Sequence, residues 1–277
     1  MFTLNCKGRI LAIDKPIVMG IINITPDSFF EGSRHTEIDS ILKQAEQMLA
    51  DDATILDIGG QSTRPGSIKI PADEEMKRVL EPIKKIAETF PEAFISVDTY
   101  YSSVAKEAVE AGACIVNDIS AGSIDGDMIK TVSSLKVPYV LMHMKGTPQT
   151  MQQDPHYENA TKEILDFFIS RKKELNDAGI KDVLIDPGFG FGKTIEHNFE
   201  LLNNLSVFKM LDALLLLGIS RKSMISKTLQ VKTADTLNGT TVLNTIGLMN
   251  GASILRVHDV KQAKETIEIF YRTIKSI

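Results

Sequence analysis

The stretch Val183-Leu-Ile-Asp-Pro-Gly-Phe-Gly-Phe-Gly-Lys-Thr194 decides the fold. Its first residues are apolar and strand-like, and the run ends at Asp186, which a proline and three glycines follow closely. Glycine and proline interrupt regular strands, so the pattern predicts a carboxylate at the carboxyl end of a strand, beside a turning backbone. Open α/β sheets and α/β barrels keep their active sites at that edge.

Two other interpretations of this stretch are available. A phosphate-binding P-loop has four residues between its first glycine and its Gly-Lys pair, whereas three residues separate Gly188 from Gly192. A proline also occupies the position of the earlier glycine. The other alternative is a strand-to-helix turn whose acid only caps a helix. Recurrence of the same pattern along the chain argues against that alternative.

Eight strand-like runs alternate with eight amphipathic segments of helical periodicity. The runs are 17–23, 54–60, 94–99, 114–120, 139–144, 183–188, 213–220 and 253–259. The amphipathic segments are 38–50, 73–90, 102–111, 127–135, 159–178, 196–205, 234–250 and 260–274. Mostly apolar strands are typical of a parallel sheet buried on both faces, and eight such units predict an α/β fold, a (β/α)8 or TIM barrel. A doubly wound open sheet is the alternative.

The residues before the first run add a small element. Residues 3–13 read as two short strands around Lys7-Gly8, which predicts an N-terminal β-hairpin at one end of the barrel. The regular alternation leaves no room for a second domain. We therefore expect one domain over residues 1–277, close to the roughly 250 residues usual for this barrel.

Composition excludes several classes of protein. A hydrophobic content of 43%, a charged content of 24% and a net charge of -5 indicate a globular protein with no reason to bind nucleic acid or an anionic membrane. No apolar run approaches about 18 residues and no signal region begins the chain, so we expect a cytoplasmic protein. Cys6 and Cys114 suggest neither a disulfide framework nor a zinc site, and Cys114 is expected in the core.

Polar side chains end every strand run. They are Asn23, Asp57, Asp98, Asn117, Asp118, His143, Asp186, Ser220, Arg256 and His258. Such groups are costly to bury without a partner or ligand, and the carboxyl ends of the strands of a barrel meet at one mouth. We therefore expect a binding site built from them at that mouth.

One part of this set suits a flat polar ring. Asp186 can accept two parallel N–H bonds from a 2-amino-4-oxo-pyrimidine edge, as in a pterin or guanine. Asp98 and Asn117 offer contacts to other ring nitrogens, and Met142 and Phe191 offer apolar faces. Lys222 would reach the ring's carbonyl oxygen, although a solvated loop charge is the alternative.

A second part suits an anion. Arg64, Arg256 and His258 are bases at strand exits, and guanidinium binds phosphate with two parallel bonds. Asn23 is a neutral oxygen ligand suited to Mg²⁺ that is held mainly by substrate phosphates and water. Ser220 has no obvious histidine partner in the sequence, so no pair of strong nucleophile and base is predicted. The site is expected to act by positioning and by stabilising charge.

Short motifs in this order resemble the dihydropteroate synthase family over almost the whole chain. They are Met19-Gly-Ile-Ile-Asn-Ile-Thr-Pro-Asp-Ser-Phe29, Asp57-Ile-Gly-Gly-Gln-Ser-Thr-Arg-Pro-Gly66, Ser96-Val-Asp-Thr99, Val116-Asn-Asp-Ile119, Leu141-Met-His143, Asp186-Pro-Gly-Phe-Gly-Phe-Gly-Lys193, Ser220-Arg-Lys-Ser223 and Arg256-Val-His258. The resemblance implies a pterin-binding TIM barrel of folate biosynthesis, a target of sulfonamide drugs. Such an enzyme joins (7,8-dihydropterin-6-yl)methyl diphosphate to 4-aminobenzoate and releases diphosphate with Mg²⁺ as cofactor.

The resemblance also implies a role for each matching residue. The pterin would be bound by Asp98, Asn117, Met142, Asp186, Phe191, Lys222 and Arg256. Diphosphate would be bound by Asn23, Arg64, Arg256 and His258, with Asn23 as the metal ligand. The aminobenzoate pocket would be formed by Phe29, Thr63, Pro65, Phe191, Lys222 and Ser223. The catalytic set would be Asn23, Arg64, Asp98, Lys222, Arg256 and His258.

Two positions depart from the family pattern. Gln61 stands where the family usually has Glu, and Glu31 stands where it usually has Asp. These departures leave open a pterin-binding protein without turnover, and a methyltetrahydrofolate-dependent methyltransferase shares the pterin-binding barrel. Family members are commonly homodimers, to which residues 245–248 or 264–270 would contribute, although amphipathic helices of a monomer look the same.

Overall fold

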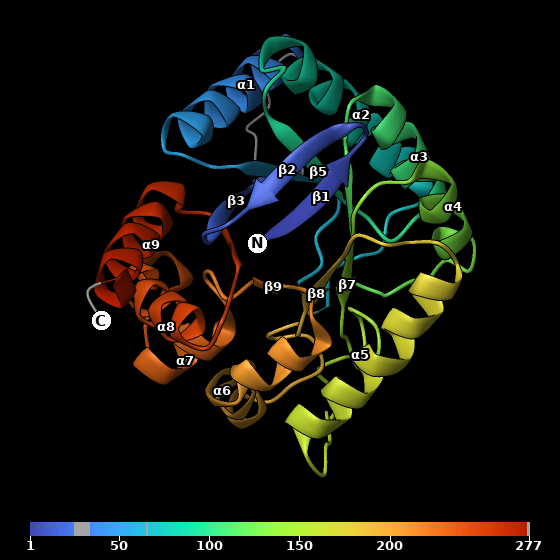
Figure 1. Cartoon of the computed structure of the whole chain (residues 1–277). Coiled ribbons are helices and arrows are strands. Elements are labelled where there is room, and N and C mark those ends of the chain that lie inside the picture. The colour runs from blue at the N-terminus through green and yellow to red at the C-terminus, as the bar shows by residue number, and fades with distance from the viewer. Residues whose placement is uncertain (25–33, 65, 276–277) are drawn as a thin grey trace.

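A closed barrel of parallel strands forms the centre of the protein (Figure 1). The computed structural model describes residues 1–24, 34–64 and 66–275. The barrel strands are β3 (Ile17–Asn23), β4 (Ile55–Gly59), β5 (Phe94–Asp98), β6 (Ile115–Asp118), β7 (Tyr139–Met142), β8 (Val183–Asp186), β9 (Leu214–Leu217) and β10 (Ile254–Val257). Strand β10 pairs with both β9 and β3, which closes the ring and excludes the open doubly wound sheet. The predicted (β/α)8 barrel is confirmed.

Helices surround the barrel on its outer side (Figure 1). They are α1 (Arg34–Ala50), α2 (Ala72–Thr89), α3 (Ser102–Ala111), α4 (Met128–Leu135), α5 (Ala160–Asp177), α6 (Ile195–Asn203), α7 (Ser223–Leu229), α8 (Leu237–Met249) and α9 (Val260–Lys275), with 3-10 turns η2 (Leu205–Leu211) and η3 (Thr233–Asp235). The main hydrophobic core lies between these helices and the strands.

Helix α7 was not predicted. It has seven residues, too few to show a helical period in the sequence, and Met224 and Ile225 bury its inner side. Most strands are also shorter than their apolar runs. Residues 114–120, for example, contain a strand only over Ile115–Asp118, because Asp118 then turns the chain by accepting the Ser120 amide at 2.7 Å.

The predicted hairpin closes the amino end of the barrel. Strands β1 (Phe2–Cys6) and β2 (Arg9–Ile13) pair around Lys7 and Gly8, which both have positive φ, as a two-residue hairpin turn of type I′ requires. Alternate residues of the two strands face inward, where they pack against the first residues of the barrel strands. These inward residues are Leu4, Cys6, Leu11 and Ile13.

Both cysteines belong to the hydrophobic cluster that the hairpin covers at the amino end of the barrel. Cys6 and Cys114 are free and buried, so the expectation that Cys114 is a core residue is confirmed. Within the described ranges, no helix has the length and apolar character needed to cross a membrane.

Candidate active site

Arg256 lies at the centre of a polar cluster at the carboxyl end of the barrel. Its Nε donates to Asp57 Oδ2 at 2.6 Å, and its Nη2 donates to Asp98 Oδ2 at 2.6 Å. Asn117 Nδ2 also donates to Asp57 Oδ2, at 3.0 Å. Side chains from β10, β4, β5 and β6 are therefore joined in one hydrogen-bonded group, as the convergence of strand ends predicted.

The charges in this group stabilise one another. Burial raises the pKa of Asp98 to about 7, although Arg256 pulls it downward. Burial also opposes the charge of Arg256, but Asp57 and Asp98 outweigh that effect and raise its pKa above the ordinary value. Arg256 is thus a fixed cation, and removal of its charge would leave a buried carboxylate without its partner.

Asp57 is a site residue missing from the predicted contact sets. Its side chain is fully buried, and its Oδ1 has no hydrogen-bond partner among the described residues. The sequence placed Asp57 at a strand end, but its pairing with Arg256, almost 200 residues away, depends on barrel closure between β3 and β10. Asp57 therefore holds both Arg256 and Asn117 in place through its Oδ2.

Asp186 and Lys222 form the other side of the cluster. Asp186 ends β8, is 5% exposed, and accepts the Gly188 amide on Oδ1 at 2.7 Å. Burial raises the pKa of Asp186, while Lys222 opposes the shift. Burial lowers the pKa of Lys222 to about 8, while Asp186 raises it. Each charge is therefore partly maintained by the other across the mouth.

Lys222 also contacts the glycine-rich loop after β8. Its Nζ donates to the Phe189 carbonyl and lies 4.4 Å from the centre of the Phe191 ring. Lys222 is partly buried, so it is not the fully solvated loop charge that was the alternative. Met142, which ends β7, is buried nearby in a small cluster with Phe191 packed against it. The structure thus brings the two predicted apolar groups together.

Lys193 fixes the shape of that loop. The residue is 2% exposed, and its ammonium group donates to the carbonyls of Gly188 at 2.9 Å and Phe191 at 3.0 Å, with His143 Nδ1 at 3.1 Å. A Cβ on Gly188, whose φ is +69°, would lie 1.9 Å from the His143 carbonyl oxygen. Because the ammonium group of Lys193 donates its hydrogen bonds to backbone carbonyls, it is not the phosphate-binding lysine of a P-loop, and that alternative is wrong.

His258 follows Arg256 by two residues on the predicted anion side, and Arg64 is close enough to His258 to act on its charge. His258 Nδ1 is 3.1 Å from Ser220 Oγ. Burial lowers the pKa of His258 to about 4, and Arg221, Arg256 and Arg64 add to the effect. The expectation that Ser220 has no histidine partner is wrong: the two residues are 38 positions apart, and the pairing of β9 with β10 brings them together.

Two of the strand-end residues do not face the mouth. Asp118 accepts hydrogen bonds from Ser120, from the Gly122 amide and from the Tyr139 hydroxyl, which makes it a structural carboxylate. His143 contacts Phe167 edge-on at 4.9 Å. Successive residues of a strand point to opposite faces, so Asp118 must turn away when Asn117 faces Asp57.

The predicted aminobenzoate wall is only partly described. Phe29 and Pro65, as well as Glu31, lie outside the described residues. Thr63 is half-buried in the loop after β4, and Ser223 is exposed at the start of α7, next to Lys222. Asn23 is exposed at the end of β3.

Gln61 holds the loop after β4. Its Oε1 accepts the Ile70 amide at 3.0 Å and its Nε2 donates to the Tyr100 hydroxyl, while Tyr101 donates to the Ile70 carbonyl at 2.7 Å. These bonds explain how a neutral amide serves at this position, because Gln61 both donates and accepts there.

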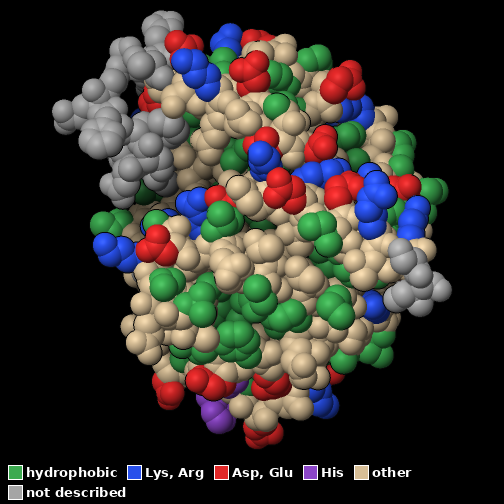
Figure 2. All heavy atoms as spheres, turned by 90° about the vertical axis from the view of Figure 1, so that its left-hand side faces the viewer, with side chains coloured by type: hydrophobic (Ala, Val, Ile, Leu, Met, Phe, Trp, Pro, Cys, Tyr) green, Lys and Arg blue, Asp and Glu red, His purple; other side chains and the backbone are tan. Residues whose placement is uncertain are grey.

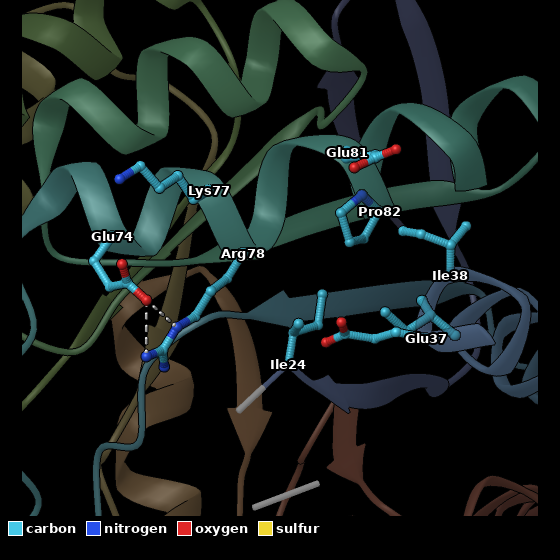
Figure 3. A pocket seen from close by; sticks show the side chains of 9 residues that line it. Ile24, Glu37, Ile38, Glu74, Lys77, Arg78, Glu81 and Pro82 are labelled. Carbon is cyan, nitrogen blue, oxygen red and sulfur yellow. Dashed lines mark hydrogen bonds and ion pairs between the residues drawn. The ribbon is translucent and has the colours of Figure 1, made fainter. Parts of the chain in front are cut away.

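A separate pocket of about 210 Å³ lies between α1 and α2, outside the mouth (Figure 3). Ile24, Glu37 and Pro82 line it, and Arg78 and Glu74, one turn apart on α2, form an ion pair at 3.2 Å. Arg78 also donates to the Gly60 carbonyl at 3.0 Å. No predicted site residue in the described ranges lines this pocket, so the chemistry belongs to the polar cluster at the mouth.

Comparison with known proteins gives the family to which this chain belongs. Residues 19–258 match the family described as pterin binding enzyme. Dihydropteroate synthase of Escherichia coli is 41% identical over 272 residues, covering 98% of this chain and 96% of that protein. Dihydropteroate synthase of Yersinia pestis, solved with a sulfonamide drug, is 39% identical with a TM-score of 0.93, covering 99% of this chain and 100% of that one.

A third similar protein was solved with a bound small molecule. Dihydropteroate synthase from Xanthomonas albilineans in complex with 7,8-dihydropteroate is 34% identical, with a TM-score of 0.89 and full coverage of both chains. Family match, identity and structural similarity all extend over the barrel that carries the Arg256 cluster. The chain belongs to the pterin-binding enzymes, and within them to the dihydropteroate synthase family.

Proposed function

We propose that this enzyme condenses (7,8-dihydropterin-6-yl)methyl diphosphate with 4-aminobenzoate to give 7,8-dihydropteroate and diphosphate. The observation that carries the proposal is the bridge from Arg256 to Asp57 and Asp98, with Asn117 bonded to Asp57. This group presents carboxylates, an amide and a guanidinium at one mouth. The Xanthomonas albilineans relative, solved with 7,8-dihydropteroate, supports the choice of product.

The pterin is assigned to the deeper part of the mouth. Asp186, which is already positioned by the Gly188 amide, would accept N–H bonds from the 2-amino-pyrimidine edge of the ring. Asn117 donates one of its two amide hydrogens to Asp57, and its side-chain oxygen would accept from a ring nitrogen. Lys222 would move from the Phe189 carbonyl to the ring's oxygen.

The diphosphate is assigned to the side that carries Arg64, Arg256 and His258. A second cationic contribution would come from Mg²⁺. Two oxygen donors that would fit it, Asn23 Oδ1 and Asp98 Oδ2, lie beside Gly59, at 3.7 and 3.8 Å from the point where a Cβ on that glycine would stand. Oxygen donors of this kind suit Mg²⁺. Among the described residues no cluster of His, Cys, Asp or Glu would hold a metal unaided, so phosphates and water would complete its shell. Bound Mg²⁺ would neutralise charge on the diphosphate.

The aminobenzoate is assigned to the rim, with Thr63, Phe191, Lys222 and Ser223 among its contacts.

In the proposed SN1-like step, the bond between the pterin methylene carbon and the diphosphate oxygen breaks, and diphosphate keeps the electron pair. The dihydropterin ring and nearby carboxylates such as Asp98 stabilise the resulting cation. The arylamine nitrogen then bonds to the carbon and loses a proton to water. An arylamine is largely unprotonated at neutral pH, so no strong base is required.

A diphosphate-release assay tests the proposed function. We expect release when both substrates are present and little release when either is omitted. Chelation of divalent cations should slow turnover by at least about tenfold, and added Mg²⁺ should restore it, because the leaving group is then neutralised again.

Each alternative has its own outcome in that assay. Binding of the pterin diphosphate without release in the presence of 4-aminobenzoate would show a pterin-binding protein without turnover. Full turnover in the presence of chelator would contradict the Mg²⁺ assignment alone.

We also propose a homodimer formed by the face that α7, α8 and α9 share. Hydrophobic side chains gather on this side of the molecule (Figure 2). On α8, Val242, Ile246 and Met249 are 50%, 37% and 70% exposed, and their spacing places them on one helix face. Exposed apolar patches of this kind mark protein interfaces. A cytoplasmic location stays a prediction from the sequence.

Val242→Glu is expected to convert the dimer to a monomer in sedimentation velocity, because a charge would be buried in the apolar contact. Ile169→Glu is the matched control, since Ile169 on α5 is also 50% exposed but lies outside this face. A wild-type monomer, or a Val242→Glu dimer of unchanged affinity, would rule the interface out.

A further inference from the structure

Ser220 contacts the imidazole ring of His258, a residue of the predicted anion site. It follows β9 and is 5% exposed, while His258 follows the neighbouring strand β10. Ser220 Oγ lies 3.1 Å from His258 Nδ1 and 3.3 Å from the backbone nitrogen of the same residue. One hydroxyl group therefore contacts His258 at two points.

Counting hydrogens assigns the direction of these two bonds. The backbone N–H of His258 can only donate, so Ser220 Oγ accepts it. The hydroxyl then has one hydrogen of its own, and Nδ1 is its acceptor among the contacts described for it. If Nδ1 carried the proton, this buried hydroxyl hydrogen would have no partner in the described structure, which is unfavourable. Nδ1 is therefore unprotonated.

We propose that Ser220 is a positioning residue that holds His258 as the Nε2–H tautomer, so that the ring donates a hydrogen bond to the diphosphate of the substrate. This inference rests on the proposed function for the identity of the ligand. The state of the ring in the free protein does not depend on that identity.

The surroundings of His258 favour a neutral ring. Burial, together with the basic groups Arg221, Arg256 and Arg64, lowers its pKa to about 4, while the acidic group Asp259 opposes them. A neutral imidazole has one donor and one acceptor, so its tautomer decides which atom faces the ligand. A fixed tautomer provides a donor that is already oriented before the anion binds.

Ser220 is not needed to hold the two loops together. The adjacent residues Arg221 and Asp259 form a forked ion pair, with Nε to Oδ2 at 3.1 Å and Nη2 to Oδ1 at 2.6 Å. Arg221 N also donates to Thr240 Oγ1 at 3.3 Å. Removal of the Ser220 hydroxyl should therefore leave the fold intact, with a change in Tm below about 4 °C.

The first test reads the ring directly. In protein labelled with ¹⁵N-histidine and free of ligand, NMR should show an unprotonated Nδ1 and a protonated Nε2 for His258, the peak being assigned by its absence in His258→Asn. In Ser220→Ala the two nitrogens should move toward the averaged shifts of exchanging tautomers, and Ser220→Thr should keep the wild-type pattern. A protonated Nδ1 in the wild type, or an unchanged Ser220→Ala spectrum, would overturn the assignment.

The second test measures ligand binding and turnover. Ser220→Ala should weaken binding of inorganic pyrophosphate and raise KM for the pterin diphosphate by about 3- to 10-fold, the effect of one neutral hydrogen bond, with a smaller change in kcat. Ser220→Thr should restore both values. Ser226→Ala, on the outer part of α7, is the control and should match the wild type. An unchanged KM and pyrophosphate affinity in Ser220→Ala would contradict the positioning role.

The two tests separate the inference from the proposed function. Absence of product from the wild-type enzyme, together with the expected NMR pattern, would reject the function and retain the assignment of the ring. Normal product formation with a protonated Nδ1 would do the reverse.

Discussion

Arg256→Ala is expected to reduce kcat/KM for the pterin diphosphate by at least about 30-fold, because truncation of a buried, hydrogen-bonded charge costs roughly 2 to 5 kcal/mol. The guanidinium bonds to both Asp57 and Asp98, and the variant would leave both carboxylates without it. The pKa of Asp98 would rise further, since Arg256 is the group that lowers it. Steady-state kinetics with varied pterin diphosphate would measure the loss.

Two further variants make this result specific. Arg256→Lys keeps a cation but loses the fork that reaches two carboxylates, so it should recover only part of the activity. Arg9→Ala removes an arginine at the opposite end of the barrel, where it donates to backbone carbonyls of residues 91–93, and should keep kcat/KM. Near wild-type kinetics for a folded Arg256→Ala protein would refute the role given to this residue.

Asp186→Asn is expected to weaken pterin binding by about 2 kcal/mol or more, roughly 30-fold in Kd, because one charge-assisted forked contact is lost. The amide that replaces the carboxylate also presents hydrogens where the ring presents hydrogens. The variant keeps the size of the side chain, and one oxygen can still accept the Gly188 amide. Isothermal titration calorimetry with the pterin diphosphate would measure the change.

Asp182→Asn is the matched control. Asp182 directly precedes β8, at the end away from the mouth, and accepts the Asn5 amide at 2.7 Å. The same chemical change there should leave pterin affinity unaltered. Equal affinities for the wild type and Asp186→Asn would remove Asp186 from the pterin site.

The barrel and the location of its polar mouth could be predicted because both follow from periodic patterns. Apolar runs of strand length, each followed by a helical period, specify parallel strands, and parallel strands deliver their carboxyl ends to one edge. Asp98, Asn117, Asp186 and Arg256 could be assigned to that edge without coordinates. The roles that the family resemblance gives to each of them are still predictions.

The remaining features depend on contacts that no local pattern encodes. Asn117 and Asp118 are adjacent and both polar, so strand alternation puts them on opposite faces, but only the folded barrel decides that the first faces Asp57 and the second faces Tyr139. In the sequence, Lys193 figured only as the lysine of the P-loop alternative, but the folded loop surrounds it with carbonyls. The pairing of Ser220 with His258 exists because β9 and β10 are neighbours.

The N-terminal hairpin covers the amino end of the barrel, so ligands can reach the site only from the carboxyl end. Since Leu4 and Leu11 help to fill the amino end, a reactant arriving at buried Asn117 enters and departs over the opposite rim, past exposed Arg64. With the pterin assigned to the deeper part of the mouth and the aminobenzoate to its rim, as proposed, we expect the pterin to bind first and the product to leave over the same rim.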